Sequence, residues 1–382
     1  MNVPKLRFKE FNEELNTFKI KDTGNVITGM TPSTADKENY GTEYLWVSPG
    51  DMGYSKYIAN TKTKLSLKGF NKTRQLPDNS ILVTCIGSTI GKMGMSNSTL
   101  STNQQINSII PTKIFNPNYL YYCINYNFPK FLNKISFQAV PIISKSEFEK
   151  LEIKCTPNLS EQEKIGNMLD LLDKKIELQS KKIEDLKLFK LYIKNQIFKD
   201  YDEIFKLKDI LVKWNKKNKN NSVKYVESIS NKYGFIAQSD QFEDRNVASK
   251  DLNNYYIIEK GVFGYNPSRL NVGSLALKAN DKVSVVSPLY ECFTTSQNNQ
   301  YLLEWFDSKY FRKETISKFE GGVRNTLNFS NLCEIEIGLP TIEKQNKYSK
   351  IFKIFNNKIE FEVKKLYKLQ ELKKGLMQSM FV

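Results

Sequence analysis

Glycine-rich and amide-rich segments contain the residues of this chain that could do chemistry. The segment GSTIGKM, from Gly87 to Met93, has the glycines and the lysine of a phosphate-binding loop, in which backbone amides hold a nucleotide phosphate. The spacer between its glycines is one residue short, and Met93 stands where a hydroxyl residue would bind magnesium. This segment therefore does not predict nucleotide hydrolysis.

Two shorter motifs also fail as catalytic sites. NPNY, from Asn116 to Tyr119, lacks the second proline of the Asn-Pro-Pro-Tyr motif of amino-methyltransferases, and no Gly-x-Gly loop is present to hold a methyl donor. Glu152-Ile-Lys154 could end a nuclease carboxylate–lysine set, but the sequence places no partner aspartate, and a polar strand edge is the simpler interpretation. The chain contains no histidine, which removes imidazole chemistry. We therefore expect no catalytic residue and no metal site.

Three polar loops have side chains suited to reading the edges of nucleic-acid bases. TNQQIN, residues 102–107, presents Asn and Gln amides, which can pair with adenine through two hydrogen bonds. YNPSRLNVGS, residues 265–274, and GGVRNTLNFS, residues 321–330, each offer an arginine, the usual partner of guanine, beside asparagine and glycine. Asparagine and glycine are also ordinary turn residues, so each loop alone leaves both interpretations open.

The charge of the chain favours a polyanionic partner. The formal net charge is +16 and comes entirely from lysine and arginine. One run between Met52 and Pro77 contains basic residues and no acidic one: Lys56, Lys62, Lys64, Lys68, Lys72 and Arg74. A second run lies in an Asn-rich loop: Lys213, Lys216, Lys217, Lys219 and Lys224. Neutralising phosphates with such residues releases counterions, although solubility or AT-rich codon usage could also produce a lysine-rich chain.

Cysteine usage and hydropathy indicate a cytoplasmic protein. The five cysteines form no Cys-x-x-Cys pair and are odd in number, which argues against a zinc site or a disulfide framework. The N-terminal residues lack the apolar region of a signal peptide, and no apolar run approaches the length of a membrane span. We expect no membrane partner.

The element that must position the polar loops is a repeat. Residues 159–198 return as residues 342–381 at a constant offset of 183, so that Gln162 matches Gln345 and Phe198 matches Phe381. Each copy has apolar residues at heptad spacing, which predicts two long helices, the first on the order of 58 Å at 1.5 Å per residue. The alternative is two unrelated amphipathic helices packed on separate cores.

Polar residues interrupt both apolar seams at the same two steps, and such residues usually set the register of a coiled coil. They are Gln179 and Lys190 in the first copy and Glu362 and Lys373 in the second. One antiparallel register places Lys190 opposite Glu362 and Gln179 opposite Lys373 at once. We therefore predict an antiparallel coiled coil in that register. Four apolar residues would overhang the paired region and would need another surface to cover them: Ile165, Leu169, Tyr348 and Phe352.

The remaining residues predict two β-rich domains. Short strand-like runs separated by Gly, Pro, Asn and Ser fill residues 1–156 and again residues 200–339. The repeat helices occupy residues 157–199 and 340–382. A repeated domain and helix within one chain predicts an α+β, pseudo-twofold protein.

The number and order of these motifs resemble the specificity subunit of type I restriction-modification systems. In the first half the matching segments are VPKLRFKEF, TGMTPST, IGSTIGKMG, STNQQI and QAVPIISKSEFEKLEI. In the second half they are GVFGYNPSRLNVGS, VVSPLYECF and GGVRNTLNFSNLCEIEIGLP. The two LSEQEKI-like helices complete the pattern, which covers essentially the whole chain.

The resemblance implies two target recognition domains, each reading one half of a split double-stranded DNA sequence, with the helices as a ruler between them. It also implies two methyltransferase subunits and two restriction/translocase subunits as partners. S-adenosylmethionine, ATP and magnesium would belong to those partners, and this chain would be non-catalytic. Half-sites would lie roughly one turn apart, about 34–36 Å. The two halves carry different motifs, so the target should be asymmetric.

The candidate sites follow from the loops, the charge and this resemblance. The overhanging residues Ile165, Leu169, Tyr348 and Phe352 would dock against a recognition domain or a methyltransferase subunit. DNA contact is expected from Lys62, Lys64, Lys68, Ser88, Thr89, Lys92, Asn103, Gln104, Gln105, Tyr265, Asn266, Arg269, Asn271, Ser274, Gly322, Arg324 and Asn325. The rival hypotheses are a coiled-coil scaffold, an orphan member without DNA readout, and a lone nuclease.

Overall fold

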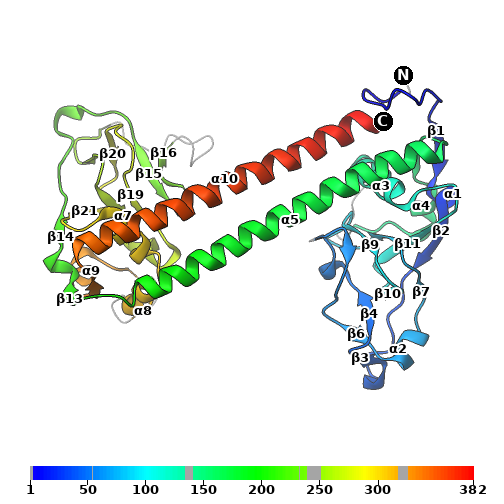
Figure 1. Ribbon diagram of the computed structural model, residues 1–382, viewed down its shortest axis with the longest axis horizontal. Helices are drawn as coiled ribbons and strands as arrows, with labels where there is room; N and C mark the ends of the chain where they lie inside the picture. The colour runs from blue at the N-terminus through cyan, green and yellow to red at the C-terminus, as the bar shows by residue number, and fades with distance from the viewer. Residues whose placement is uncertain (1–2, 54, 134–140, 232, 239–250, 317–325) are drawn as a thin grey trace. The chain divides into compact units, whose positions relative to one another are not determined.

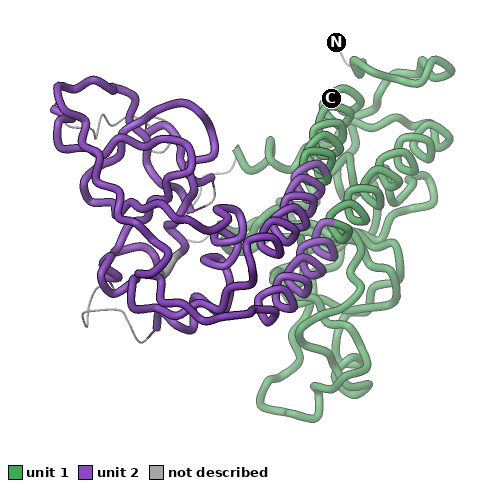
Figure 2. Tube along the Cα trace, turned by 60° about the vertical axis from the view of Figure 1, so that its left-hand side comes forward, with its two compact units in different colours: residues 1–182, 362–382 green, residues 183–361 purple. Residues whose placement is uncertain are grey.

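The chain folds into two compact units, which share the two long helices. A computed structural model describes residues 3–53, 55–133, 141–231, 233–238, 251–316 and 326–382 (Figure 1). Unit 1 comprises residues 1–182 with 362–382, and unit 2 comprises residues 183–361 (Figure 2). Each unit therefore contains one β-rich domain together with part of each long helix.

Unit 1 is built on two five-stranded sheets and a short strand pair. The first sheet has the order β2 (Gly24–Thr28), β11 (Ile106–Pro111), β8 (Ile81–Thr84), β9 (Met93–Ser96) and β5 (Tyr57–Ile58). The second has the order β3 (Tyr40–Gly41), β6 (Lys64–Leu65), β4 (Tyr44–Val47), β10 (Leu100–Thr102) and β7 (Gln75–Leu76). Strand β1 (Asn16–Lys19) pairs with β12 (Glu152–Cys155), and the helices are α1 (Ile20–Thr23), α2 (Leu67–Asn71), α3 (Pro117–Leu132) and α4 (Lys145–Lys150).

Strand β8 lies between two cores, which explains its unbroken apolar sequence. Successive side chains of a strand point to opposite faces of the sheet. Ile81 and Val83 pack with residues of α3 in one cluster, whereas Leu82 packs with Met52 and Leu100 in another. A strand covered on both faces needs apolar residues at every position rather than at alternate positions.

Unit 2 has a four-stranded sheet with the order β14 (Leu211–Lys213), β21 (Glu291–Thr295), β18 (Phe263–Tyr265) and β19 (Leu275–Leu277). Two strand pairs accompany it, β15 (Glu227–Ser230) with β16 (Gly234–Ala237) and β17 (Tyr256–Ile258) with β20 (Ser284–Val286). Strand β13 (Glu203–Lys206) pairs with β22 (Glu336–Leu339). The helices are α7 (Asn299–Phe306), α8 (Lys309–Ile316) and α9 (Phe329–Cys333).

The two β-rich domains repeat one strand order. The antiparallel order β2-β11-β8-β9 in unit 1 corresponds to β14-β21-β18-β19 in unit 2, and β1 with β12 corresponds to β13 with β22. The turn between β8 and β9 therefore has the same place in its sheet as the turn between β18 and β19. The sequence had presented GSTIGKM and NPSRLNVG as different motifs.

The long helices are α5 (Leu159–Ile197) and α10 (Ile342–Met380), each of 39 residues. Within unit 1, the start of α5 packs on the end of α10, because Asp173 contacts Lys373 and Gln179 contacts Glu362. Within unit 2, Lys190 contacts Asn356. The helices are thus antiparallel, and the predicted α+β fold of β-rich domains with two long helices is confirmed.

The predicted register of the helices is wrong. The Gln179 Nε2 atom donates to Glu362 Oε2 at 2.7 Å, and Lys373 pairs with Asp173 at 2.6 Å, so Gln179 does not face Lys373. The polar partners of Lys190 are Glu304 and Asn356 instead of Glu362. The observed register is displaced by about one heptad, a shift that leaves both apolar seams aligned. Seam periodicity alone therefore could not distinguish the two registers.

The four residues predicted to overhang are covered by their own units. Ile165 and Leu169 lie in a core cluster with residues of α3 and with Met377 of α10. Phe352 is fully buried in the core of unit 2, and Tyr348 packs against that core. Of the two predicted surfaces, a recognition domain or a partner subunit, the structure covers these residues with the β-rich domains, so their assignment to partner-subunit docking is corrected.

A repeated glutamine attaches each β-rich domain to its long helix. In unit 1, the backbone amide of Asn116 donates to Gln162 Oε1 at 2.8 Å, and Asn116 is the N-cap of α3. In unit 2, the amide of Asn298 donates to Gln345 Oε1 at 3.1 Å, and Asn298 is the N-cap of α7. The identity of the two glutamines in the sequence repeat thus reflects one attachment used twice.

Candidate nucleic-acid interface

The turn between β8 and β9, residues 85–92, is the centre of the candidate interface in unit 1. Gly87 and Gly91 have φ angles of 95° and 89°, which favour glycine and let the chain reverse tightly. Ser88 is exposed, whereas Thr89 and Lys92 are half-buried. The turn that was rejected as a nucleotide-binding loop is therefore a β-hairpin turn that presents short polar side chains.

The TNQQ turn, residues 102–105, lies directly beside the first turn. The backbone amide of Cys85 donates to the carbonyl of Gln105 at 2.8 Å. The Gln105 Nε2 atom lies 3.5 Å from the place that a Cβ would take on Gly87. A Cβ at position 87 would only touch the Gln105 amide at ordinary van der Waals distance, so the positive φ of Gly87, and not a lack of space, favours glycine between the turns.

The three amide residues of this turn divide into one that builds it and two that line its surface. Asn103 is buried, its Oδ1 accepts from the Gln105 amide at 3.1 Å, and its Nδ2 donates to Gln105 Oε1 at 2.9 Å. Gln104 is exposed and accepts a hydrogen bond from Thr31, and Gln105 is half-buried. The structure therefore assigns Asn103 to holding the turn and leaves Gln104 and Gln105 as the candidate base readers.

A third segment adjoins these turns in each unit. In unit 1, the amide of Gly87 donates to the carbonyl of Pro141 at 3.0 Å, and that of Ile143 donates to Cys85 at 2.8 Å. In unit 2, the amide of Leu327 donates to the carbonyl of Pro267 at 3.1 Å, so the corresponding segment lies beside the corresponding turn. Gly322, Arg324 and Asn325 of this segment lie outside the described residues, and their predicted role stays a prediction.

The turn of unit 2 between β18 and β19 contains a short 3₁₀ helix, Pro267–Val272. Asn266 caps this helix by accepting from the Ser268 amide at 3.0 Å, and Gly273 ends it with a φ angle of 88°. Arg269 is exposed on the helix. Arg269 is therefore presented by a rigid turn at the same place in the sheet as Ser88 and Thr89 in unit 1; Asn271 lies in the same helix.

Two predicted DNA contacts in unit 2 are instead part of the domain core. Tyr265 is fully buried in β18, and burial raises the pKa of its hydroxyl. Ser274 is 1% exposed, and its backbone carbonyl accepts from the Asn266 amide at 3.1 Å. Both residues were predicted from their position in a polar loop, but Tyr265 is the last residue of β18, Ser274 directly precedes β19, and both are buried.

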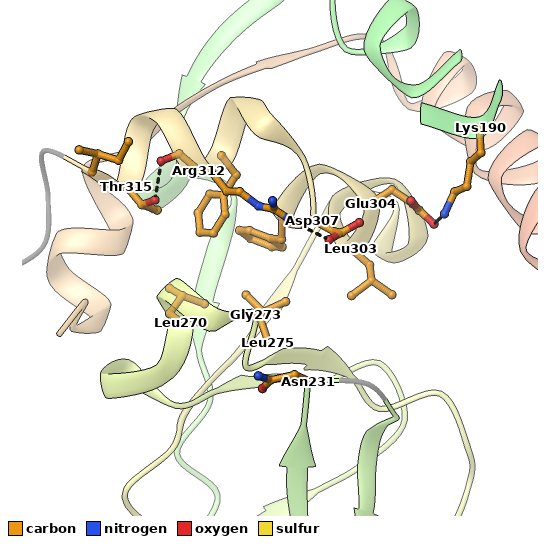
Figure 3. Close-up of a pocket in the computed structure, with 13 residues that line it drawn as sticks. Lys190, Asn231, Leu270, Gly273, Leu275, Leu303, Glu304, Asp307, Arg312 and Thr315 are labelled. Atoms are coloured by element: carbon orange, nitrogen blue, oxygen red, sulfur yellow. Dashed lines mark hydrogen bonds and ion pairs between the residues drawn. The ribbon is translucent and has the colours of Figure 1, made fainter. Parts of the chain in front are cut away.

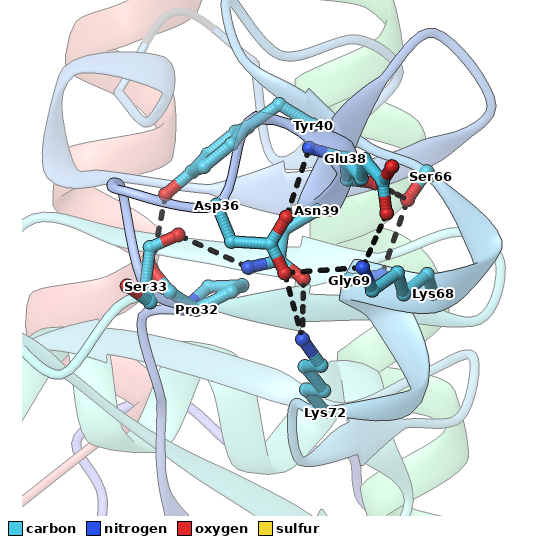
Figure 4. Close-up of polar contacts among 10 residues, drawn as sticks. All are labelled: Pro32, Ser33, Asp36, Glu38, Asn39, Tyr40, Ser66, Lys68, Gly69 and Lys72. Carbon is cyan, nitrogen blue, oxygen red and sulfur yellow. Dashed lines mark hydrogen bonds and ion pairs between the residues drawn. The ribbon is translucent and has the colours of Figure 1, made fainter.

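Two of the four lysines predicted to contact DNA in unit 1 lie in a strand and a helix outside the turns. Lys64 lies in β6 and Lys68 in α2, at the end of unit 1 opposite to α3 and α4 (Figure 1). The ammonium of Lys68 pairs with Glu38 and with Asp36, and Lys72 pairs with Asp36 at 3.1 Å (Figure 4). The charge of Lys68 is thus matched within the domain.

The remaining two lysines lie elsewhere. Lys62 is exposed, and its backbone amide donates to Asp51 at 2.9 Å. Lys92, at the end of the first turn, lies against Gly53, with its Cδ atom 3.6 Å from the place of a Cβ there. Of the predicted phosphate contacts, Lys92 is therefore the one that belongs to the turn itself.

Comparison with known proteins gives a family match for the first part of the chain. Residues 12–188 match the family model described as the type I restriction modification DNA specificity domain. The type I restriction enzyme MjaVIII specificity subunit of Methanocaldococcus jannaschii is similar over 414 aligned residues, 97% of this chain and 94% of that protein, at 24% identity. The first β-rich domain and most of α5 thus match a DNA specificity domain, and nearly the whole chain is similar to a type I restriction specificity subunit.

Two further similar proteins differ in how much of the chain they cover. The MjaIX specificity subunit of the same organism is 32% identical over 190 residues, which are 48% of this chain and 44% of that protein. That match thus spans less than half the length of the relative. The crystal structure of the type I system S subunit from M. genitalium has the same fold, with a TM-score of 0.66 and 16% identity over 100% of this chain and 99% of that one.

A buried ion pair that the sequence did not predict joins the first β-rich domain to α5. The Lys56 ammonium contacts Asp170 Oδ1 at 2.7 Å and Asn118 Oδ1 at 2.6 Å, and it lies 4.6 Å from the ring centroid of Tyr122. Burial raises the pKa of Asp170, but hydrogen bonds from Lys56 and Lys174 outweigh it, so the net pKa is lowered. The only sequence signal was a lysine inside a basic run, with its partner 114 residues away.

Unit 2 also contains a hollow of about 860 Å³ beside its turn (Figure 3). Leu270 and Gly273 of the turn line one side, and residues of α7 and α8 line the other. Its charged lining residues are paired with one another, Lys190 with Glu304 at 2.9 Å and Arg312 with Asp307 at 3.5 Å. The hollow therefore separates the turn from these helices and offers no unpaired charge, among the residues named, to bind a charged ligand.

The described residues contain neither a membrane-spanning helix nor a metal-binding cluster. No helix among them is long and apolar enough to cross a membrane. No group of three or more Cys, Asp or Glu side chains in the described ranges is arranged to hold a metal ion. The candidate interface thus consists of the two hairpin turns and the segments beside them.

Proposed function

We propose that this chain reads a split, asymmetric DNA target on behalf of a type I restriction-modification complex. The observation that carries the proposal is the duplicated interface. The domain that matches the DNA specificity family has a counterpart in unit 2 with the same strand order and a polar turn at the same place. Two domains of one topology with different turn residues would read two different half-sites.

The turns supply different chemistry to the two half-sites. Gln104 and Gln105 offer amides, which suit adenine, whereas Arg269 offers a guanidinium, which suits guanine. Amides and guanidinium both act through direct contact with base edges in the major groove. The net charge of +16 would favour approach to the phosphate backbone without carrying sequence information.

Substitution in one turn should change one half-site only. We expect Gln104→Ala with Gln105→Ala to relax one half of the methylated motif, and Arg269→Ala to relax the other. A bidentate base contact contributes about 1–3 kcal/mol, or about 5- to 150-fold in discrimination. The measurement is methyl-adenine mapping of DNA modified by the complex that contains each variant.

Arg312→Ala is the matched control, because Arg312 is an exposed arginine of unit 2 that lies on α8, outside the turn, and pairs with Asp307. It should leave the motif unchanged. Equal loss at both half-sites from either turn variant would refute the assignment of the turns to separate half-sites.

The partners we propose are two methyltransferase subunits and two restriction/translocase subunits, with the complex acting in the cytoplasm. S-adenosylmethionine, ATP and magnesium would be bound by those subunits, and this chain would be non-catalytic. The match of residues 12–188 to the DNA specificity domain and the repeated attachment of the two domains through Gln162 and Gln345 support two equivalent docking positions.

The rival function is a scaffold whose helices bind protein partners without reading DNA, or an orphan member that has lost readout. Salt dependence separates these from the proposal, since DNA binding through phosphates should weaken steeply between about 50 and 200 mM salt. A scaffold would not bind added duplex DNA in this salt-dependent way.

A further inference from the structure

A basic loop of unit 2, defined as residues 214–226, joins β14 to β15 and belongs to neither turn of the candidate interface. It contains four lysines, Lys216, Lys217, Lys219 and Lys224, all exposed. A fifth exposed lysine, Lys282, lies next to the loop with its ammonium 3.2 Å from the ring centroid of Tyr225. The four lysines of the loop and Lys282 therefore place five positive charges on one part of unit 2.

The basic loop is held at both ends by backbone pairing with the β17–β20 pair. Near its start, the amide of Ile257 donates to the carbonyl of Lys216 at 2.8 Å, and Lys217 forms a β-bridge with Tyr256. Near its end, the amide of Val285 donates to the carbonyl of Tyr225 at 2.8 Å. The loop thus spans the strand pair from one edge to the other.

Asparagines fix the middle of the basic loop. Asn218 is fully buried, donates to the carbonyl of Val223 at 2.8 Å and accepts from its amide at 2.9 Å. Asn220 and Asn221 have φ angles of 61° and 50°, a conformation that asparagine tolerates better than most residues. The conformational entropy of ordering this segment has therefore been lost on folding, before any partner binds.

The positive charge of the basic loop is only partly matched inside the protein. Lys216 pairs with Glu259 at 2.5 Å, and Lys217 donates to the Asn254 amide oxygen at 3.5 Å. Within the described ranges, Lys219, Lys224 and Lys282 form no ion pair with an acidic side chain. Exposed ammonium groups on a rigid backbone suit contacts with phosphates, which need charge and no fixed planar geometry.

The equivalent position in unit 1 is different. There the segment after β2 supplies Asp36 and Glu38, which pair with Lys68 and Lys72 of α2 (Figure 4). The same place in the fold is thus neutralised in one domain and left positive in the other. A uniformly lysine-rich composition would not produce this difference.

We propose that the basic loop binds the phosphate backbone of duplex DNA and contributes affinity without reading bases. The proposal rests on the proposed function, because it assumes that unit 2 lies on DNA. The loop would add to the salt-dependent part of binding, while Arg269 and its turn would determine which bases are accepted.

The test is a triple variant, Lys217→Gln, Lys219→Gln and Lys224→Gln, of the full chain in complex with its methyltransferase subunits. Affinity is measured between about 50 and 200 mM salt for a duplex that contains the target and for an unrelated duplex. The slope of log affinity against log salt should become shallower by about 0.9 for each lost phosphate contact, or about 2.7 in all. The loss should be similar for both duplexes, and the methylated motif should be unchanged.

Two controls separate the loop from charge and folding. Lys181→Gln, Lys187→Gln and Lys368→Gln remove three exposed lysines from the long helices, and this variant should keep the wild-type slope. The triple variant Lys217→Arg, Lys219→Arg and Lys224→Arg, which keeps the positive charge, should have the wild-type slope. An equal change in the helix variant, or an altered methylated motif in the loop variant, would overturn the proposal.

Different results would refute the role of the basic loop and the proposed function. A wild-type complex with a steep salt slope and a loop variant with the same slope would refute the role of the basic loop and leave the proposed function standing. A wild-type complex that binds the target duplex without salt dependence would refute both.

Discussion

Replacing Lys278 with alanine is expected to destabilise unit 2 by about 3–5 kcal/mol, a large part of the stability of a typical domain. The side chain of Lys278 is 0% exposed and pairs with Glu227, whose side chain is 3% exposed. Without the lysine, the carboxylate would remain buried with Ser284 Oγ, 2.5 Å away, as its hydrogen-bond donor. One hydroxyl cannot replace a cation in a medium of low dielectric constant.

Urea unfolding followed by tryptophan fluorescence measures this effect in one unit. In a Trp46→Phe background, the remaining tryptophans are Trp214 and Trp305, both in unit 2. Lys278→Met combined with Glu227→Gln should cost much less, because no buried charge is left unpaired. Lys260→Ala breaks the exposed pair with Asp281 and should cost less than about 1 kcal/mol. Similar losses for Lys278→Ala and Lys260→Ala would contradict a buried pair.

The second large effect is expected at the attachment of the first β-rich domain. Lys56→Ala should destabilise unit 1 by about 3 kcal/mol, because it leaves Asp170 buried with one cation, Lys174. Lys174→Ala is the matched control on the same carboxylate. Its side chain is 59% exposed, so its loss should cost less than about 1 kcal/mol.

Unfolding of the two variants under identical conditions decides this prediction, and methylation gives a second readout. If the proposed readers are right, recognition of the half-site assigned to Gln104 and Gln105 should be lost in Lys56→Ala at a lower temperature than recognition of the half-site assigned to Arg269. Equal stability of Lys56→Ala and Lys174→Ala would show that burial of the ion pair does not matter.

The same ion pair predicts a pH dependence. The pKa of Asp170 is lowered in the folded chain, so its contribution to stability is fully present above the unfolded value of about 3.9. That contribution is lost as the pH falls through the lower folded value. The difference in unfolding free energy between the wild type and Asp170→Asn should therefore be constant near neutral pH and shrink below about pH 4.

The long helices could be predicted because the evidence for them is local. Each copy contains its own heptad seam, and apolar periodicity directly indicates a helix. The matching residues at an offset of 183 show that the same pattern occurs twice. The register of the two helices also depends on contacts with the β-rich domains. Lys190 and Lys373 contact Glu304 and the Tyr122 ring of the β-rich domains as well as the facing helix. No pattern within the helices records those contacts.

The candidate interface could be predicted as segments but not as side chains. The polar turns were found from glycine, asparagine and glutamine, whereas Tyr265, Ser274 and Asn103, which were predicted to contact DNA, are buried. These residues flank or brace a turn, and which way a flanking residue points depends on the sheet beneath it. Lys56 shows the opposite error, since a lysine in a basic run is buried by a partner on a distant helix.

The measurement that tests the central claim most directly is genome-wide methyl-adenine mapping in cells that contain this chain with its methyltransferase subunit, compared with cells that lack only this chain. The account predicts a motif of two specified halves separated by a fixed number of unspecified bases, with unequal halves, that disappears when the chain is absent. A palindromic motif, or a motif that persists without the chain, would contradict the account.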